Sequence, residues 1–245
     1  MNTALAWLAA LLLGSCLIGS NATSSASSAR ADRDERVGRL HLQFEYDSFR
    51  RYGPAARPID FESIDHDLLA AAVFHETNRQ RARHRRAALG YRPELLEAAR
   101  LQAQSMARTG TISHRHRDRR LRTVTDRLER AGLQPAFAAE NVAMTFGIRY
   151  EAGRAVYRRQ ESGAILFSYR PDGAPIEPHT YLSFAEDLVG QWMASASHRE
   201  NILHPQAAEM GSAHEHARNE QGMDTFYSAQ VFFQELKANR RPRQR

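Results

Sequence analysis

The sequence predicts an α+β domain, and two patterns of apolar residues predict it. In residues 93–110 the apolar positions recur at helical spacing, which indicates a helix with one buried face. In residues 208–217 and 225–234 they alternate instead, as expected of strands with one face toward a core. Helices that surround antiparallel strands form a layered α+β domain.

Helix signals begin at about residue 65. The first predicted helix covers about residues 65–88, with an apolar start and an arginine-rich end. The second begins at Pro93, which suits a first helical position, and ends at Gly110, which suits a residue just past a helix.

Capping boxes mark three further helices. The pairs are Thr123 with Asp126, Ser183 with Glu186, and Ser197 with Glu200. The first precedes a helix over about residues 124–131. The last makes His198 the first residue of a short helix that Pro205 ends.

Two hairpins are predicted in the second half of the chain. The loop RNEQGMD at residues 218–224 joins the two alternating runs, and residues 153–170 form a second candidate hairpin. On the last run, four residues share one strand face: Tyr227, Ala229, Val231 and Phe233.

The N-terminus has the length and composition of a signal peptide, over residues 1–22. Its apolar run is too short to span a bilayer comfortably. The sequence allows two alternative cleavage sites. Cleavage before Cys16, in the lipobox-like LGSC, would leave a lipidated cysteine, and cleavage after Ala22 would remove it. Since Cys16 is the single cysteine of the chain, neither product has an internal disulfide.

The remaining chain divides by composition. Residues 23–62 are predicted as a disordered tether and extended lead-in, residues 63–237 as the folded domain and residues 238–245 as a basic tail. The net charge is +6, but no aromatic platform accompanies the arginine runs. We therefore expect no specific nucleic-acid partner, whereas anionic components of a cell envelope are candidate partners.

Candidate chemistry is carried by histidines and one acid. The positions are His114, the pair Glu140-Asn141, His198, and His214 with His216. Two imidazoles and a carboxylate could hold a divalent metal such as zinc, or could perform acid–base work. The positive end of a helix would keep His198 neutral, which suits both. The alternative is that these side chains only satisfy loops and caps.

The sequence indicates no nucleophile. Ser197 is assigned to a helix cap, no G-x-S-x-G turn occurs, and Cys16 lies in the signal region. The chain also lacks H-E-x-x-H, phosphate-loop and dinucleotide-binding patterns. We therefore predict no catalytic residue.

The order of these motifs resembles the CAP superfamily (cysteine-rich secretory proteins, antigen 5 and pathogenesis-related proteins), in its bacterial SCP-like extracellular branch. The resemblance spans about residues 66–234. The matching stretches are HETNRQRARH, PELLEAARLQAQSMARTGTISH, TDRLERAGLQPAFAAENVAM, LVGQWMASASHRENIL, AEMGSA and FYSAQVFF.

The resemblance implies a three-layer α-β-α sandwich with an antiparallel sheet. It also implies a cleft whose ligand-binding residues are His114, Glu140, Asn141 and His198. The implied metal ligands are His114, Glu140 and His198. A structural role is implied for Asn78 and Arg81, which match an N-x-x-R pattern.

The chain departs from the family pattern at several places, and the loss of an acidic ligand at Ser195 weakens the metal prediction. Ser195 stands where relatives often carry a glutamate, and Ala139 replaces a glycine. Residues 149–182 are longer than the usual connection and could form a hairpin beside the cleft. Glu177 or His179 would then be a substitute ligand.

These observations lead us to expect a non-enzymatic, monomeric binding module of the cell envelope. It would be periplasmic, an outer-membrane lipoprotein or secreted, and would touch the membrane only through a lipid on Cys16. Its ligand would be a lipid, a glycan or a protein. Two alternatives stay open: a metal-dependent protease or esterase that uses His114, Glu140 and His198, and a basic adaptor for an anionic polymer.

Overall fold

The computed structural model describes residues 20–236 and divides the chain into two compact units, residues 1–36 and residues 37–245. The described part of the first unit is helical and belongs to α1 (Ser20–Leu42). Residues 1–19 of the predicted signal peptide, Cys16 among them, and the predicted basic tail lie outside the described residues. Among residues 20–236, no helix is both long and apolar enough to cross a membrane.

The structure corrects the prediction of a tether and extended lead-in over residues 23–62. It has α1 there, followed by α2 (Tyr46–Arg50) and the 3-10 helix η1 (Gly53–Ala56). Low apolar content predicted disorder, but alanine, arginine and glutamate also have high helix propensity. In α2, a capping box at Glu45 and the complete burial of Phe49 hold the turn in place.

The main sheet has four strands in the order β1-β5-β6-β2. Its central hairpin, β5 (Glu209–Arg218) and β6 (Asp224–Glu235), confirms the prediction from alternation. The sequence analysis missed the two outer strands. They are β2 (Pro135–Phe146), antiparallel to β6, and β1 (Gly90–Tyr91), which is parallel to β5. Pro135 obscured β2, although proline is tolerated at the first residue of a strand.

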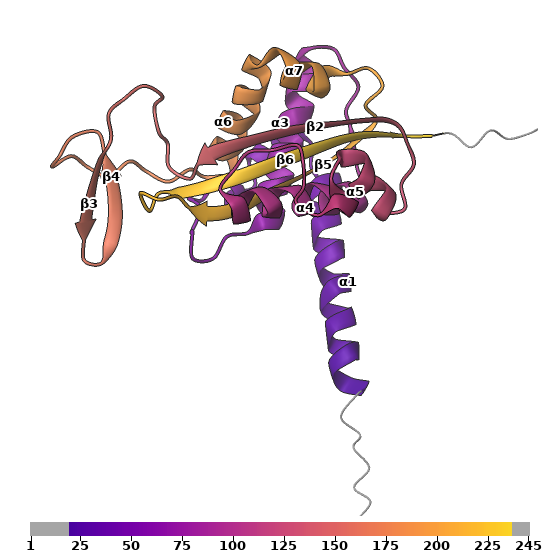
Figure 1. Cartoon of the computed structure of the whole chain (residues 1–245), viewed down its shortest axis with the longest axis horizontal. Coiled ribbons are helices and arrows are strands. Elements are labelled where there is room, and N and C mark those ends of the chain that lie inside the picture. Colours follow the sequence, from indigo (N-terminus) through magenta and orange to yellow (C-terminus); the bar gives the residue numbers. More distant parts are fainter. Residues whose placement is uncertain (1–19, 237–245) are drawn as a thin grey trace, which may run out of the picture. The chain divides into compact units, whose positions relative to one another are not determined.

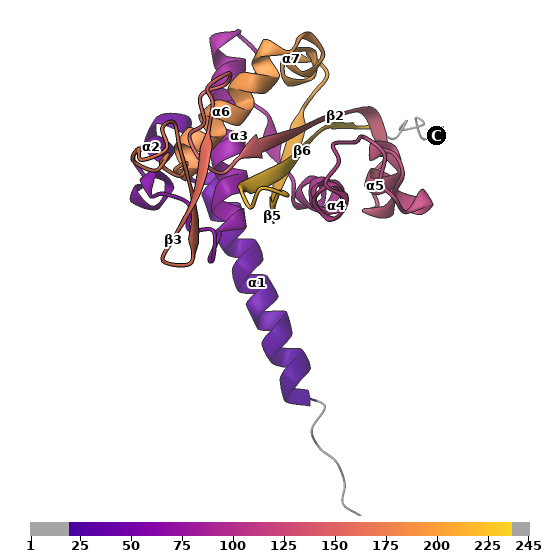
Figure 2. The ribbon, with the colours of Figure 1, turned by 60° about the vertical axis from the view of Figure 1, so that its left-hand side comes forward.

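Helices cover both faces of this sheet, as Figures 1 and 2 show. One face packs on α3 (His66–Arg83), α6 (Tyr181–Ala194) and α7 (Ala196–Leu203), and the other on α4 (Pro93–Thr109) and α5 (Val124–Arg130). Successive side chains of β6 point to opposite faces of the sheet and so contribute to two cores. Phe226 and Phe232 lie in the first, whereas Tyr227, Ala229, Val231 and Phe233 lie in the second. This arrangement confirms the predicted three-layer sandwich.

The predicted helix ends hold for α4 and α5 but not for the two helices that follow. Gly110 adopts the left-handed conformation after α4, and Thr123 caps α5 through Asp126. By contrast, the capping box of α6 is Thr180 with Ser183, one turn before the predicted Ser183–Glu186 pair. Burial of Tyr181 and Phe184 explains the earlier start, because it anchors that first turn in the core.

The helix α7 also begins earlier than predicted, at Ala196. Ser195 is at once the C-cap of α6 and the N-cap of α7, and its backbone N–H donates to the carbonyls of Gln191 and Trp192. Ser197 and His198 therefore lie within the first turn, and Ser197 is not the cap. Pro205 follows the end of the helix, as expected.

The predicted second hairpin is present as β3 (Tyr157–Glu161) and β4 (Ala164–Ser168). Its two turn residues, Ser162 and Gly163, both have positive φ, as a tight hairpin turn requires. The hairpin packs beside the β5–β6 turn, where Gly222 leaves room for Ile165. A Cβ on Gly222 would lie 2.6 Å from Cδ1 of Ile165.

We predict that Gly211→Ala destabilises the protein by about 2–3 kcal/mol, because overpacking a core contact costs about that much. Gly211 on β5 lies against the start of α4, and an added Cβ would overlap backbone atoms of Leu95 and Leu96. Urea unfolding of the purified protein measures the change. Gly190→Ala, within α6, is the matched control, since no atom lies within 4 Å of its added Cβ. The control should be neutral or stabilising, and equal losses in both variants would contradict the prediction.

Candidate functional site

The structure brings three of the predicted site residues together, and with Arg127 we call them the histidine site. Nδ1 of His114 lies 3.0 Å from Oε1 of Glu140. His198 is close enough to His114 for the charge of one imidazole to lower the pKa of the other. Glu140 lies on β2, His114 in the loop after α4 and His198 in the first turn of α7.

Arg127 on α5 completes the site, and the sequence analysis did not identify it. Its guanidinium is buried and donates to Oε2 of Glu140 and to the carbonyl of Leu121. A buried guanidinium requires such a partner, because burying an unpaired charge is costly. The sequence showed only that Arg127 sits in the helix capped by Thr123. Which β2 side chain it would meet depends on how α5 packs.

The two histidines have opposite pKa shifts. The hydrogen bond to Glu140 raises the pKa of His114, and desolvation partly offsets this rise. The His114 side chain is 57% exposed. Burial, and to a lesser extent the charge of His114, lowers the pKa of His198. Burial and the neighbouring imidazole of His114 thus favour a neutral His198 here, whereas the sequence prediction rests on the positive end of a helix. The environment therefore favours the protonated form of His114 and the neutral form of His198.

Asn141 lies beside the site as a buried residue that positions the backbone of His198. Its side chain is fully buried, and its Nδ2 donates to the carbonyl of His198 at 3.1 Å and to Oε1 of Gln230 at 3.3 Å. Its Oδ1 accepts a hydrogen bond from Asn201 at 2.9 Å. This series of hydrogen bonds continues from Gln230, whose Nε2 donates to the hydroxyl of Thr77 on α3. Asn141 thus positions the backbone of His198, and its own amide is already occupied by protein partners.

The N-x-x-R pair of α3 has a structural role. Asn78 makes two hydrogen bonds with the backbone of Leu89. Arg81 is buried and donates to the carbonyls of Ala87, Ile202 and His204. It therefore ties α3 to the end of α7, and through it fixes the helix that carries His198.

The other candidate histidines are engaged elsewhere. His214 is buried against Ser228, and His216 contacts Asp224 at 2.8 Å. His179 contacts Ser183 at 3.0 Å, and Glu177 contributes its backbone carbonyl to Arg149. Ser195 and Ser197 contact one another, at 3.4 Å between their hydroxyl oxygens. Neither substitute ligand joins the histidine site in residues 20–236.

The arrangement of the donors does not fit a divalent metal. Both oxygens of Glu140 are taken, one by His114 and one by Arg127. The Glu140 carboxylate also favours the protonated form of His114, whereas a metal ligand must be neutral. Within residues 20–236, no three His, Cys, Asp or Glu side chains are grouped so that they could hold an ion.

A basic loop, which we call the arginine loop, adjoins the histidine site. Its members are Arg115, Arg117, Arg119, Arg120 and Arg122, all exposed. The loop is fixed from inside: His116 is buried and its N–H donates to the carbonyl of Arg122, while Asp118 caps the 3-10 helix η2 (Arg119–Leu121). Among residues 20–236, no acidic side chain pairs with these five guanidiniums.

We predict that Glu140→Ala lowers the free energy of unfolding by about 3–5 kcal/mol, because it leaves buried Arg127 without a counter-charge. His114→Ala removes an exposed partner of the same carboxylate and should cost less than about 1 kcal/mol. Urea unfolding of both variants gives the comparison. Similar losses for the two would show that Arg127 and Glu140 do not form the dominant pair.

The stabilisation that His114 provides should depend on pH. The folded pKa of His114 is raised, so its contact with Glu140 stabilises fully below the ordinary histidine pKa of about 6.5. This stabilisation is lost as the pH rises through the folded pKa. The unfolding free energies of wild type and His114→Ala should therefore converge at high pH. A difference that instead grows as the pH rises would contradict a protonated His114.

Comparison of the sequence with models of protein families identifies one family. A family model described as the cysteine-rich secretory protein family matches residues 74–232. Comparison with curated protein sequences gives no match.

Several solved structures are similar in fold. An extracellular protein containing an SCP domain from Bacillus anthracis is 19% identical with a TM-score of 0.46, and the match covers 73% of this chain and 45% of that one. An outer surface protein from Borrelia burgdorferi is 14% identical with a TM-score of 0.42, covering 67% and 90% of the two chains. This chain thus spans less than half the length of the Bacillus protein. Because the family model matches more than half of the sequence, the chain belongs to the cysteine-rich secretory protein (CAP) family.

Proposed function

We propose that this protein is a non-enzymatic binding module that holds an anionic group of an envelope lipid or glycan at the histidine site. The observation that carries this proposal is the saturation of Glu140 by Arg127 and His114. With the carboxylate neutralised, the exposed edge of His114 presents an N–H donor. A charge-assisted hydrogen bond to a phosphate or carboxylate is the strongest interaction that such a donor makes.

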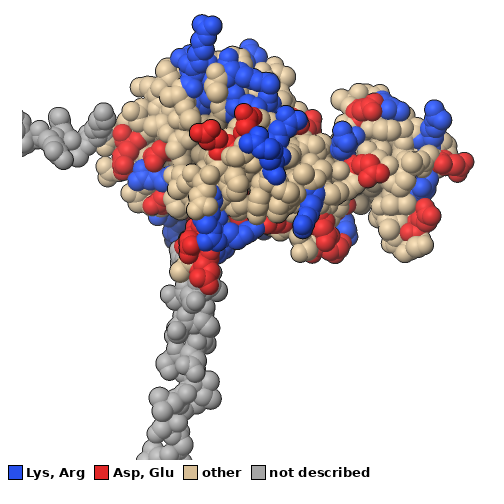
Figure 3. Space-filling view, turned by 180° about the vertical axis from the view of Figure 1, so that it is seen from behind, with Lys and Arg blue, Asp and Glu red and all other residues tan. Residues whose placement is uncertain are grey.

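The surrounding charge supports an anionic ligand. The arginine loop follows His114 directly and carries five exposed guanidiniums. Further arginines lie where α3 ends beside α7: Arg83, Arg85 and Arg86 are exposed there. Figure 3 shows basic side chains gathered at the upper end of one face, the end that holds α7 in Figure 1. Several positive charges close together attract an anion and raise its local concentration.

A metal-dependent hydrolase is the second candidate, motivated by two histidines and an acid near one another. It would require Glu140 to exchange Arg127 and His114 for an ion. The buried guanidinium of Arg127 would then lose its counter-charge, which makes this exchange unfavourable. We therefore favour binding over hydrolysis.

We also propose an extracytoplasmic location, in the periplasm, on the outer membrane or in the medium. The apolar segment before Cys16 has signal-peptide character, and lipidation of Cys16 would supply an anchor. The CAP family is named for secretory proteins, which agrees with export. We propose that the protein works as a monomer.

The proposal predicts that the protein binds soluble dihexanoyl phosphatidylglycerol or polygalacturonate, an anionic glycan, in preference to zwitterionic dihexanoyl phosphatidylcholine. Isothermal titration at low and high salt tests this, and the two anionic probes distinguish a lipid from a glycan. His114→Ala should weaken binding about tenfold, as expected for one charge-assisted hydrogen bond. Arg130→Gln, an exposed arginine of α5, is the control and should change little.

Two results would overturn this function. Equal affinity for the anionic and zwitterionic lipids would remove the case for anion recognition. Stoichiometric zinc in the purified protein, lost in both His114→Ala and His198→Ala, would instead favour the metal-dependent alternative.

A further inference from the structure

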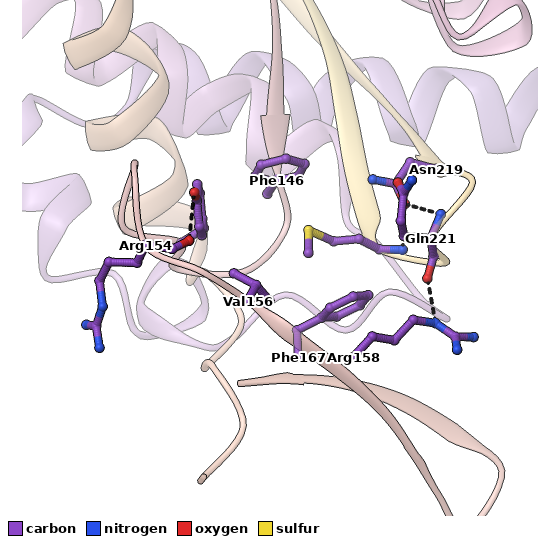
Figure 4. Close-up of a pocket in the computed structure, with 9 residues that line it drawn as sticks. Phe146, Arg154, Val156, Arg158, Phe167, Asn219 and Gln221 are labelled. Carbon is purple, nitrogen blue, oxygen red and sulfur yellow. Dashed lines mark hydrogen bonds between the residues drawn. The ribbon is translucent and has the colours of Figure 1, made fainter. Parts of the chain in front are cut away.

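A second candidate site lies at the C-terminal end of β2, between the β3–β4 hairpin and the β5–β6 turn. A pocket of about 340 Å³ opens there (Figure 4). Phe146 at its wall is six residues along β2 from Glu140, a distance of roughly 20 Å at the rise of a strand. The pocket is therefore separate from the histidine site, and its volume lies in the range of small-molecule pockets, about 300–1000 Å³.

The middle of the pocket is apolar and partly aromatic. Phe146, Val156 and Phe167 lie around it in Figure 4, and Met223 is also among the residues that line it. These side chains belong to, or pack against, a small core of Ile148, Phe167 and Met223 that is distinct from the two main cores. Aromatic and methionine walls favour a flat apolar group, because ring edges and thioethers contact π-systems well.

Unused donors lie at one end of the pocket. Arg158 donates through Nε to the carbonyl of Gln221, and no residue of the described chain accepts from its terminal nitrogens. Asn219 accepts two backbone hydrogen bonds on Oδ1, from Gln221 and Met223, which leaves its Nδ2 available. No carboxylate is among the residues that line the pocket. The available groups at this end are therefore donors, one of them cationic.

The opposite end is closed by contacts within the hairpin segment. The hydroxyl of Tyr150 donates to the carbonyl of Arg154. The guanidinium of Arg154 stacks on Tyr169 at 3.7 Å and pairs with Glu151 at 2.7 Å. Because Arg154 is neutralised by these contacts, the uncompensated positive charge of the pocket is that of Arg158.

Contacts within the protein hold the walls of the pocket in place. The bond from Arg158 to Gln221 joins the hairpin to the β5–β6 turn at 2.9 Å, and Ile165 packs over Gly222 beside it. Arg159 donates to the carbonyl of Gly173 and so fixes the other face of the hairpin. A ligand would therefore meet walls that are already in place, which lowers the entropy lost on binding.

We propose that this pocket binds a small aromatic anion, with its ring between Phe146 and Phe167 and its carboxylate or sulfonate at Arg158 and Asn219. The apolar walls select the ring, and the free guanidinium selects the charge. The proposal does not depend on the histidine site. An anion bound at His114 would meet arginines and exposed loop, whereas this pocket requires an apolar body on the ligand.

A matched ligand series tests the proposal on the full chain. The fluorescent probe 1-anilinonaphthalene-8-sulfonate reports occupation, and it is displaced by 2-naphthoate, by neutral 2-naphthylmethanol or by cationic 2-naphthylmethylammonium. We expect saturable binding in which naphthoate displaces the probe about tenfold better than the alcohol, the gain expected of one charge-assisted hydrogen bond. Binding of the cation that equals or exceeds that of the anion would overturn the proposal.

Variants assign the binding to this pocket. Arg158→Gln should abolish the preference for naphthoate and leave the affinity for the alcohol unchanged, whereas Arg149→Gln, an exposed arginine outside the pocket lining, should keep the preference. Val156→Trp fills the pocket and should abolish both. Its control is Tyr157→Trp at the exposed neighbouring position. The same loss in Tyr157→Trp, or a preference that persists in Arg158→Gln, would place the binding elsewhere. His114→Ala should have no effect, which separates this site from the proposed function.

Discussion

The structure depends on the burial of β6 on both faces. A strand covered by helices above and below cannot leave a polar side chain to water, so each one must find a partner inside the protein. Gln230 is the clearest case: it lies in the centre of β6 and bonds Thr77 on α3 and Asn141 on β2. The network then reaches the backbone of His198 through Asn141. The constraint that forms the core also places a site residue.

A buried ion pair supplies the other half of the histidine site. Arg127 and Glu140 join α5 to β2, and the pair leaves one oxygen of Glu140 for His114. The site is thus the exposed edge of two buried polar networks, one ionic and one neutral. This explains why an acid that resembles a metal ligand in the sequence acts here as a counter-charge. Its environment contains a guanidinium that a metal would have to displace.

The β3–β4 hairpin adds surface without altering this frame. It packs on the β5–β6 turn through Ile165 and Arg158, at the end of the sheet away from Glu140. On the sequence alone, residues 149–182 could form a hairpin beside the cleft and supply Glu177 or His179 as a substitute ligand, or cover the site. His179 instead lies just before Thr180, the N-cap of α6, and contacts Ser183. The pocket under the hairpin is a separate consequence of the insertion.

The sequence by itself determined the α+β class, because apolar spacing depends only on local geometry: the α4 face, the alternation of β6 and the cap at Thr123 were all readable from neighbouring residues. The three layers were expected only from the family resemblance. The motif order also identified His114, Glu140 and His198, and the structure places them near one another. Only the tertiary structure decided what these residues contact. Arg127 meets Glu140 across two elements, Asn141 is buried, and β2 forms despite Pro135 because β6 offers it a partner. Such contacts join residues far apart in the chain, and local spacing carries no information about them.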